Sequence, residues 1–183
     1  MLEKHPDDLD ALKEAADVCL AMNNPVSASQ HLRRIAENDS TDISCLIKLE
    51  DIYRHQNDTH NLIWAIEQHH GESPRDCVLI GELAELLFRE GKTEKGLEYL
   101  QKGLEISTDD GKLRILMGEY FRSRGEIEKA LREYERALQD STWRASAQEF
   151  IWQIQPPESE EEKAEREFFN SGKAPQNGNT PHE

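Results

Sequence analysis

The chain has 183 residues, a net charge of −15, 36% hydrophobic residues and 32% charged residues. Acidic residues are spread along its length and no basic stripe is present, which excludes nucleic acid as a partner and disfavours an anionic membrane surface. Three cysteines without a CxxC spacing predict no disulfide framework and favour a reducing compartment. No apolar run approaches the roughly 18 residues of a membrane span. We therefore expect a cytoplasmic protein, with a targeting or membrane segment before Met1 left open.

The stretch GEYFRSRGEIEKALREYERAL (118–138) sets small and aromatic residues at fixed offsets into a charged background. Its marked positions are Gly118, Phe121, Gly125, Ala130, Tyr134 and Ala137. A shift of 34 residues toward the N-terminus finds Ala84, Leu87, Gly91, Gly96, Leu100 and Gly103. Two further shifts find Glu50, Tyr53, Asn57, Leu62, Ile66 and His69, and then Ala16, Cys19, Asn23, Ala28, Leu32 and Ile35. Four units at one period indicate an internal repeat.

Each unit contains two helices by its apolar spacing, at i, i+3, i+4 and i+7. The column between the two helices reads Asn23, Asn57, Gly91 and Gly125. Asparagine and glycine are the residues that accept a left-handed backbone after a helix. Small residues such as Gly118 and Ala130 let the two backbones approach, while Tyr134 fills the space beside them.

Two units depart from this pattern. Glu50 and His69 occupy small-residue columns of the second unit, which predicts a less tight helix crossing there. Gly96 and Gly103 in the third unit each cost about 1 kcal/mol relative to alanine in a helix interior. We therefore expect these middle units to open first.

A 34-residue helix–turn–helix unit with these columns resembles the tetratricopeptide repeat (TPR). The resemblance covers about residues 6–142 and implies an all-α fold, a right-handed α-α superhelix (TPR-like solenoid) of antiparallel helix pairs. The expected repeats are 9–42, 43–76, 77–110 and 111–142, with the end of a preceding repeat in 1–8. We expect a capping helix at 143–154 and an acidic, largely disordered tail at 155–183, in which residues 158–169 are able to form a last helical turn or two.

TPR proteins usually bind a partner in the concave groove lined by the first helices of their repeats. By that resemblance, the candidate residues for a peptide or partner helix are Lys13, Asp17, Ile47, Asp51, Arg54, Glu85, Phe88, Arg89, Lys112, Ile115, Glu119 and Arg122. Acidic residues recur among them at the 34-residue period, and arginines form a column one turn away. One interpretation is a ladder of alternating charge that grips a peptide. The other is ion pairing within helices, such as Glu85 with Arg89 and Glu119 with Arg122.

The sequence nominates no catalytic residue, no cofactor-binding residue and no metal ligand. Carboxylate pairs at helical spacing occur everywhere among 37 acids, and no nucleotide or hydrolase motif is present. His69 and His70 point about 100° apart on a helix, which is poor geometry for a shared metal. His55 and His60 have more ordinary roles on the helix surface or at a helix end.

One TPR subclass clamps the C-terminal carboxylate of chaperones with lysine, asparagine and arginine side chains. Here each possible repeat frame keeps a single matching lysine, Lys13 or Lys112, and puts an acid at a clamp position. The chaperone clamp is therefore excluded.

Trp64 and Trp152 are candidates for a secondary interface, because exposed tryptophans often anchor partners. Trp64 is expected on the convex surface unless the second helix of its unit is rotated and buries it. Trp152 lies opposite the apolar stripe of the capping helix.

These features favour a non-enzymatic adaptor or scaffold with a protein or peptide partner. One alternative is the accessory TPR arm of a larger enzyme or membrane-anchored assembly factor whose active part precedes Met1. Another is a self-assembling homo-oligomer joined through the ends of the repeat stack.

Overall fold

The computed structural model describes residues 8–39 and 41–170, so most of the predicted preceding repeat end (1–8) and residues 171–183 of the tail lie outside it. The described residues form ten helices and no strand. The helices are α1 (Leu9–Ala21), α2 (Pro25–Asn38), α3 (Ile43–Gln56), α4 (Thr59–Glu72), α5 (Cys77–Arg89), α6 (Thr93–Ile106), α7 (Gly111–Ser123), α8 (Ile127–Ala137), α9 (Arg144–Ile154) and α10 (Glu160–Asn170).

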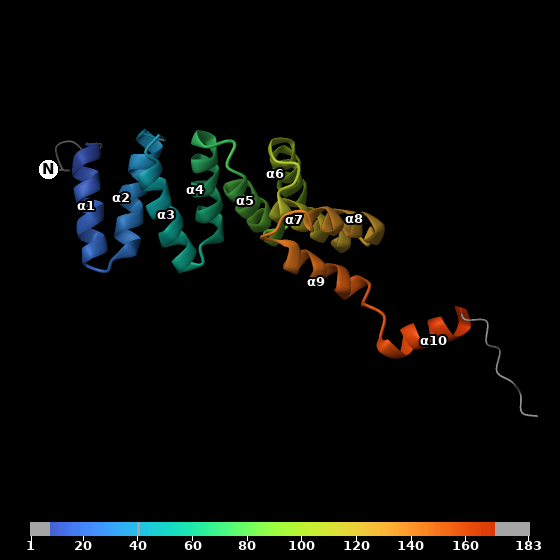
Figure 1. Cartoon of the computed structure of the whole chain (residues 1–183). Coiled ribbons are helices and arrows are strands. Elements are labelled where there is room, and N and C mark those ends of the chain that lie inside the picture. The colour runs from blue at the N-terminus through green and yellow to red at the C-terminus, as the bar shows by residue number, and fades with distance from the viewer. Residues whose placement is uncertain (1–7, 40, 171–183) are drawn as a thin grey trace, which may run out of the picture.

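Helices α1 to α8 pack as four pairs side by side along the molecule (Figure 1). Each pair contacts the next, and α9 packs on α8 at the end of the row. The predicted all-α solenoid is confirmed. Helix pairs begin at Leu9, Ile43, Cys77 and Gly111, while the assignment of each pair to a complete repeat remains a prediction.

Aspartate and asparagine side chains begin most of these helices. The residues whose side chains accept a hydrogen bond from the first turn are Asp8, Asn24, Asp42, Asp58, Asp76 and Asp110. Such caps satisfy backbone N–H groups that have no partner within the helix. The turn column adopts the left-handed backbone expected of it, with φ values of 55°, 54°, 73° and 74° at Asn23, Asn57, Gly91 and Gly125. Side-chain caps therefore begin six of these helices, and left-handed turns follow the ends of α1, α3, α5 and α7.

Close contact between helices explains the small-residue columns. A Cβ added to Gly118 would lie 2.3 Å from the ring of Tyr134, and one added to Gly96 would lie 2.6 Å from the ring of Phe88. No real Cβ contact is that short, so these positions accept only glycine while the rings stay in place. Packing therefore requires the glycines of α6. Their low helix propensity is the cost of this close contact.

The second pair fills the same columns with a bonded pair of side chains. Glu50 is 6% exposed, and its Oε1 lies 2.8 Å from Nδ1 of His69 on α4. Burial raises the pKa of Glu50, and the hydrogen bond from His69 opposes that rise. Two residues that look like faults in the repeat are therefore complementary to each other.

The C-terminal helix α9 covers the last pair. Its apolar stripe consists of Trp143 at the N-cap, Ala147, Phe150, Ile151 and Ile154. These side chains pack in one cluster with Ala130, Tyr134 and Ala137 of α8 and Ile115 of α7. The ring of Phe150 stacks on that of Tyr134, with centroids 5.2 Å apart.

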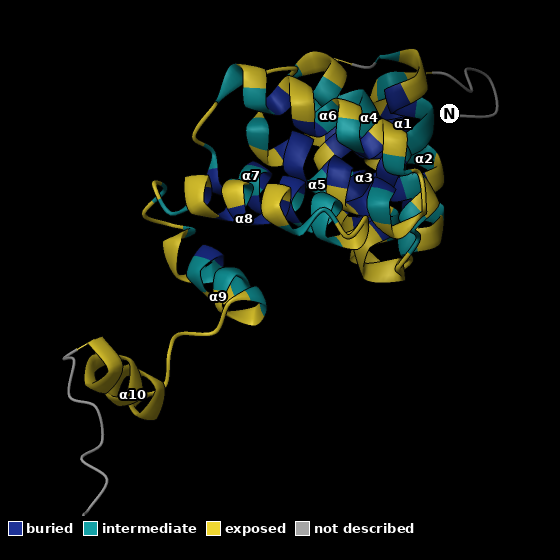
Figure 2. Ribbon diagram, turned by 90° about the vertical axis from the view of Figure 1, so that its right-hand side faces the viewer, coloured by how far each residue is buried: buried dark blue, intermediate teal, exposed yellow. Residues whose placement is uncertain are grey.

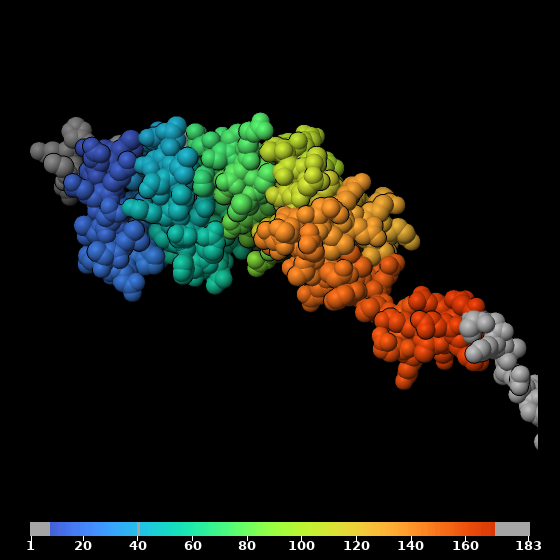
Figure 3. Space-filling model, in the orientation of Figure 1, coloured from blue at the N-terminus to red at the C-terminus, as the bar shows by residue number. Residues whose placement is uncertain are grey.

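Helix α10 differs from the expected disordered tail. Ser159 and Glu162 form a reciprocal capping box, in which the Glu162 N–H donates to Ser159 Oγ and the Ser159 N–H donates to the Glu162 carboxylate. The helix is exposed along its whole length and stands apart from the stack (Figures 2 and 3). Trp152 and Phe168 follow Gly118 and Tyr134 by 34 residues. An indole in the glycine column leaves no room for α10 to cross α9 as α8 crosses α7.

Gly103→Ala is expected to destabilise the protein although alanine is the better helix former. A Cβ at position 103 would lie 2.7 Å from Leu113 and 2.8 Å from Ile80, and displacing core side chains costs about 1–3 kcal/mol. Gly71→Ala is the matched control in a helix, because nothing lies within 4 Å of an added Cβ, and it should gain up to about 1 kcal/mol. Urea unfolding followed by circular dichroism measures both. A Gly103→Ala protein more stable than wild type would contradict the packing constraint.

Glu50→Ala and His69→Ala are each expected to lose about 3 kcal/mol of unfolding free energy, because each leaves the other polar group buried without its partner. The double variant Glu50→Ala/His69→Ala restores two small residues to the crossing. It should therefore lose clearly less than the sum of the single losses. A double-mutant cycle measures this coupling, and strictly additive losses would show that the pair does not act as a unit.

Candidate functional site

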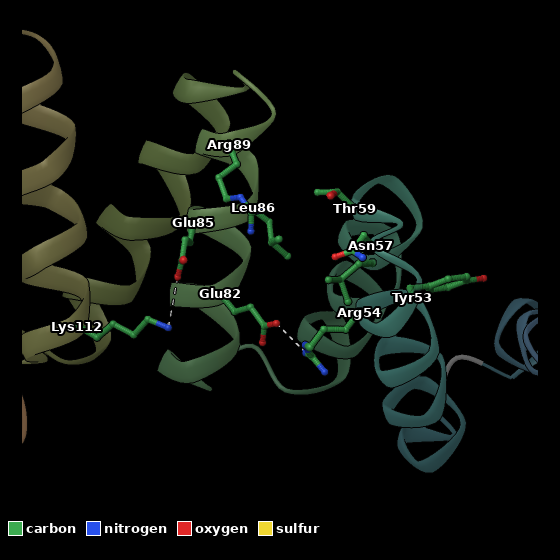
Figure 4. A pocket seen from close by; sticks show the side chains of 10 residues that line it. Tyr53, Arg54, Asn57, Thr59, Glu82, Glu85, Leu86, Arg89 and Lys112 are labelled. Atoms are coloured by element: carbon green, nitrogen blue, oxygen red, sulfur yellow. Dashed lines mark hydrogen bonds and ion pairs between the residues drawn. The ribbon is translucent and has the colours of Figure 1, made fainter. Parts of the chain in front are cut away.

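A hollow of about 280 Å³ lies between the second and third helix pairs. We call it the α3–α5 hollow, since its walls come mainly from α3 and α5, with the start of α4 and of α7 (Figure 4). Its lining residues are Tyr53, Arg54, Asn57, Thr59, Leu62, Glu82, Glu85, Leu86, Arg89 and Lys112. Arg54, Glu85, Arg89 and Lys112 belong to the groove predicted from the sequence. The structure thus brings four of the twelve predicted residues together around one space.

The turn between α3 and α4 builds one wall of this hollow. Asn57 ends α3 in the left-handed conformation, with its N–H bonded to the carbonyl of Arg54 at 3.2 Å. Asp58 caps α4 by accepting from the N–H of Asn61 at 3.1 Å. Because α4 begins directly at Thr59, the short side chains of Asn57 and Thr59 are held beside the hollow.

The charged groove residues are largely paired with one another. Pairs between neighbouring helix pairs are Lys48–Asp17 at 2.9 Å, Arg54–Glu82 at 2.7 Å and Lys112–Glu85 at 3.7 Å. Pairs within one helix are Arg54–Asp51 at 3.0 Å and Arg122–Glu119 at 2.7 Å. Lys13 lies 2.8 Å from Asp42, the cap of α3, and holds the pKa of that carboxyl below its usual range. Pairing within helices thus accounts for two of these six pairs, and the other four join different helices.

One expected pair is not formed. Glu85 precedes Arg89 by one helical turn but faces Lys112 of the next helix pair instead. Sequence spacing indicates which residues share a helix face, and it says nothing of a competing lysine on a neighbouring helix.

In the fourth pair, the groove residues Glu119 and Arg122 are held by contacts with side chains of α8 and α9. The hydroxyl of Tyr134 donates a hydrogen bond to Glu119, and burial together with this carboxylate raises the pKa of Tyr134. Arg122 lies over the ring of Phe150, 5.9 Å from its centroid, and donates to Gln153 at 3.4 Å. Helix α9 thus covers this end of the predicted groove.

The apolar candidates divide into buried and exposed side chains. Ile115 is 6% exposed, within the cluster under α9, so a partner cannot reach it in this structure. Phe88 is half-buried against α6 and stacks on Tyr120 with centroids 6.0 Å apart. Ile47 remains exposed on α3.

The two tryptophans have different surroundings. Trp64 is half-buried against the core, and the guanidinium of Arg33 lies 4.4 Å from its ring centroid. Its face is thus covered from within the chain. Trp152 is 50% exposed on α9.

A second hollow of about 320 Å³ lies between α6, α7 and α8. We call it the α6–α8 hollow. Its apolar lining consists of Leu97, Leu104, Met117, Tyr120 and Phe121. None of these residues was predicted as a binding residue, and neither were Asn57, Thr59 and Glu82 of the α3–α5 hollow. The turn column identified Asn57 only as a turn residue.

Histidines and cysteines considered for catalysis or metal binding make ordinary hydrogen bonds and packing contacts. Within the described ranges, no group of three or more His, Cys, Asp or Glu residues could hold a metal ion. His55 bonds the carbonyl of Asp51 at 2.7 Å, and His70 packs edge-on against Tyr99. Burial raises the pKa of the Cys45 thiol to about 11. No helix in the described part of the chain has the length and apolar content to cross a membrane.

Comparison with solved structures identifies the fold. The chain is similar to MamA, with 16% identity and a TM-score of 0.58 over 79% of this chain and 85% of that chain. It is similar to YrrB, described as a TPR protein with an unusual peptide-binding site, with 18% identity and a TM-score of 0.55 over 80% and 75% of the two chains. A third is a tetratricopeptide repeat protein from Parabacteroides merdae, with 19% identity and a TM-score of 0.52 over 82% and 59%.

No protein-family model and no curated protein matches the sequence. Identities of 16 to 19% carry the fold and not the function. The chain is thus a helical repeat protein with a TPR-type fold.

Proposed function

We propose that the protein is a non-enzymatic interaction adaptor that holds an extended segment or a helix of a partner protein in the groove lined by α1, α3, α5 and α7. The observation that carries this proposal is the α3–α5 hollow, which combines accessible charged and neutral polar side chains with buried apolar residues behind them. Binding sites usually have such a mixture, because apolar contacts give affinity and a few polar groups give orientation.

The ion pairs between helix pairs support this function. Lys48–Asp17, Arg54–Glu82 and Lys112–Glu85 join consecutive first helices. Each exposed pair contributes little to stability, but together they hold the groove side chains in one arrangement. A preformed surface loses less conformational entropy on binding than a mobile one. The likeness to YrrB adds a TPR-fold protein whose description names a peptide-binding site.

A peptide library displayed on phage tests the groove. Wild-type protein should enrich a common sequence, whereas Thr59→Trp, which fills the hollow without removing a hydrogen bond of that side chain, should bind the enriched peptide at least about tenfold more weakly. Arg132→Glu is the control, because Arg132 is exposed on the second helix α8 and has no ion-pair partner among the described residues. The proposal fails if no sequence is enriched or if Thr59→Trp captures the same peptides equally well.

End-to-end association of copies is a second candidate, favoured by apolar side chains at both ends of the stack. Val18 on α1 is 57% exposed, whereas Ile52 and Leu86, at the same place in the second and third pairs, are 8% and 7% exposed because the preceding pair covers them. Trp152 is exposed at the other end. If copies stack, sedimentation equilibrium should give a mass that rises with concentration, and Val18→Glu should remove that rise. A constant monomer mass would eliminate this candidate.

A further inference from the structure

One cation of the predicted groove has no ion-pair partner among the residues that the structure describes. Each of the others has a carboxylate oxygen within 4 Å, namely Lys13, Arg54, Lys112 and Arg122. Arg89 forms no hydrogen bond or ion pair with any residue that the structure describes. It is exposed in the last turn of α5 and lines the α3–α5 hollow. Its guanidinium is therefore available to an incoming anionic group.

The two acids that line the hollow together with Arg89 are already engaged. Glu85 faces Lys112, with 3.7 Å between Oε2 and Nζ, and Glu82 accepts from Nη2 of Arg54 at 2.7 Å (Figure 4). A carboxylate of a partner can therefore approach Arg89 without displacing an ion pair. Like-charge repulsion from Glu82 and Glu85 is reduced because each has a cation beside it.

Two neutral donors lie across the hollow from Arg89 (Figure 4). The amide group of Asn57 and the hydroxyl of Thr59 make no side-chain hydrogen bond within the described ranges. A carboxylate accepts several hydrogen bonds, and an arginine can donate two of them in parallel. Leu62 and Leu86 also line the hollow, but they are only 5% and 7% exposed and lie behind the polar groups.

We propose that the α3–α5 hollow binds the side-chain carboxylate of a glutamate or aspartate in the partner segment. Arg89 is the charged donor, and Asn57 and Thr59 are the neutral ones. The inference rests on the proposed function, because it names the partner chemistry of the same groove. It differs from the chaperone clamp, whose positions do not include Arg89.

The net charge of −15 does not prevent this recognition. At physiological ionic strength, charges more than about 8 Å apart are largely screened. Among the charged groups that line the hollow, the Arg89 guanidinium has no ion-pair partner within the described residues, and its sign favours an anionic ligand.

Three blocked dipeptides test the proposal on the full chain. N-acetyl-leucyl-glutamyl-amide carries only a side-chain carboxylate, N-acetyl-leucyl-glutaminyl-amide is its neutral match, and N-acetyl-leucyl-glutamine carries only a terminal carboxylate. Heteronuclear NMR follows the backbone N–H groups of Asn57, Thr59 and Arg89 and the side-chain Nε–H of Arg89. The variants are Arg89→Gln and the matched surface control Arg132→Gln, each checked for wild-type thermal unfolding.

The glutamyl probe should shift these signals and bind at least about tenfold more tightly than the glutaminyl probe. Arg89→Gln should lose this preference, and Arg132→Gln should keep it. Equal binding of the first two probes, binding of the terminal carboxylate alone, or an unchanged preference in Arg89→Gln would each overturn the inference. Library peptides that need the hollow but contain no acidic residue would refute the carboxylate site while leaving the adaptor function in place.

Discussion

The close crossing of the two helices within each pair is the constraint on which the rest of the structure depends. At Gly118 the ring of Tyr134 occupies the space that any Cβ would need. Glycine there lets the backbones approach, and the ring then buries itself completely. The hydroxyl of Tyr134 reaches Glu119 on the far side, so one steric requirement in the core also determines where a charged groove residue lies. The second pair meets the same constraint with Glu50 and His69, whose side chains bond across the crossing.

Once each pair has a fixed width, consecutive first helices stand close enough for their charges to meet. Lys48, Arg54 and Lys112 each reach an acid on a neighbouring first helix. These contacts neutralise most of the groove and leave Arg89 as its one cation without a partner among residues 8–39 and 41–170. In this account, binding specificity arises from the charge that has no partner within the groove. The total number of groove charges matters much less.

The sequence predicted the helices well, because turn and capping chemistry is local. Asn57 and Gly91 in one column require a left-handed turn at those places, and both have it. Helix α10 follows equally local chemistry, since Ser159 and Glu162 form a capping box that the acidic composition of the tail obscured. Composition describes whether a segment can build a core, and it does not describe whether a short helix can begin.

The site was less predictable, because its residues depend on contacts between helix pairs. Both Arg89 and Lys112 are candidate partners for Glu85. The packing of α5 against α7 makes Lys112 its partner. Ile115 belongs to the groove column by period, yet α9 lies over it. Trp64 is covered by Arg33 of the preceding pair. In each case the deciding distance joins residues far apart in the sequence, and no local pattern contains it.

Amide hydrogen exchange of the full chain, free and with an enriched peptide bound, tests most directly the claim that a partner lies across the α3–α5 hollow. The account predicts slower exchange over residues 53–62 and 82–91, with no change over 97–104 on α6 or in α9. Protection confined to the α6–α8 hollow, or to α1 and α9 at the ends of the stack, would contradict it.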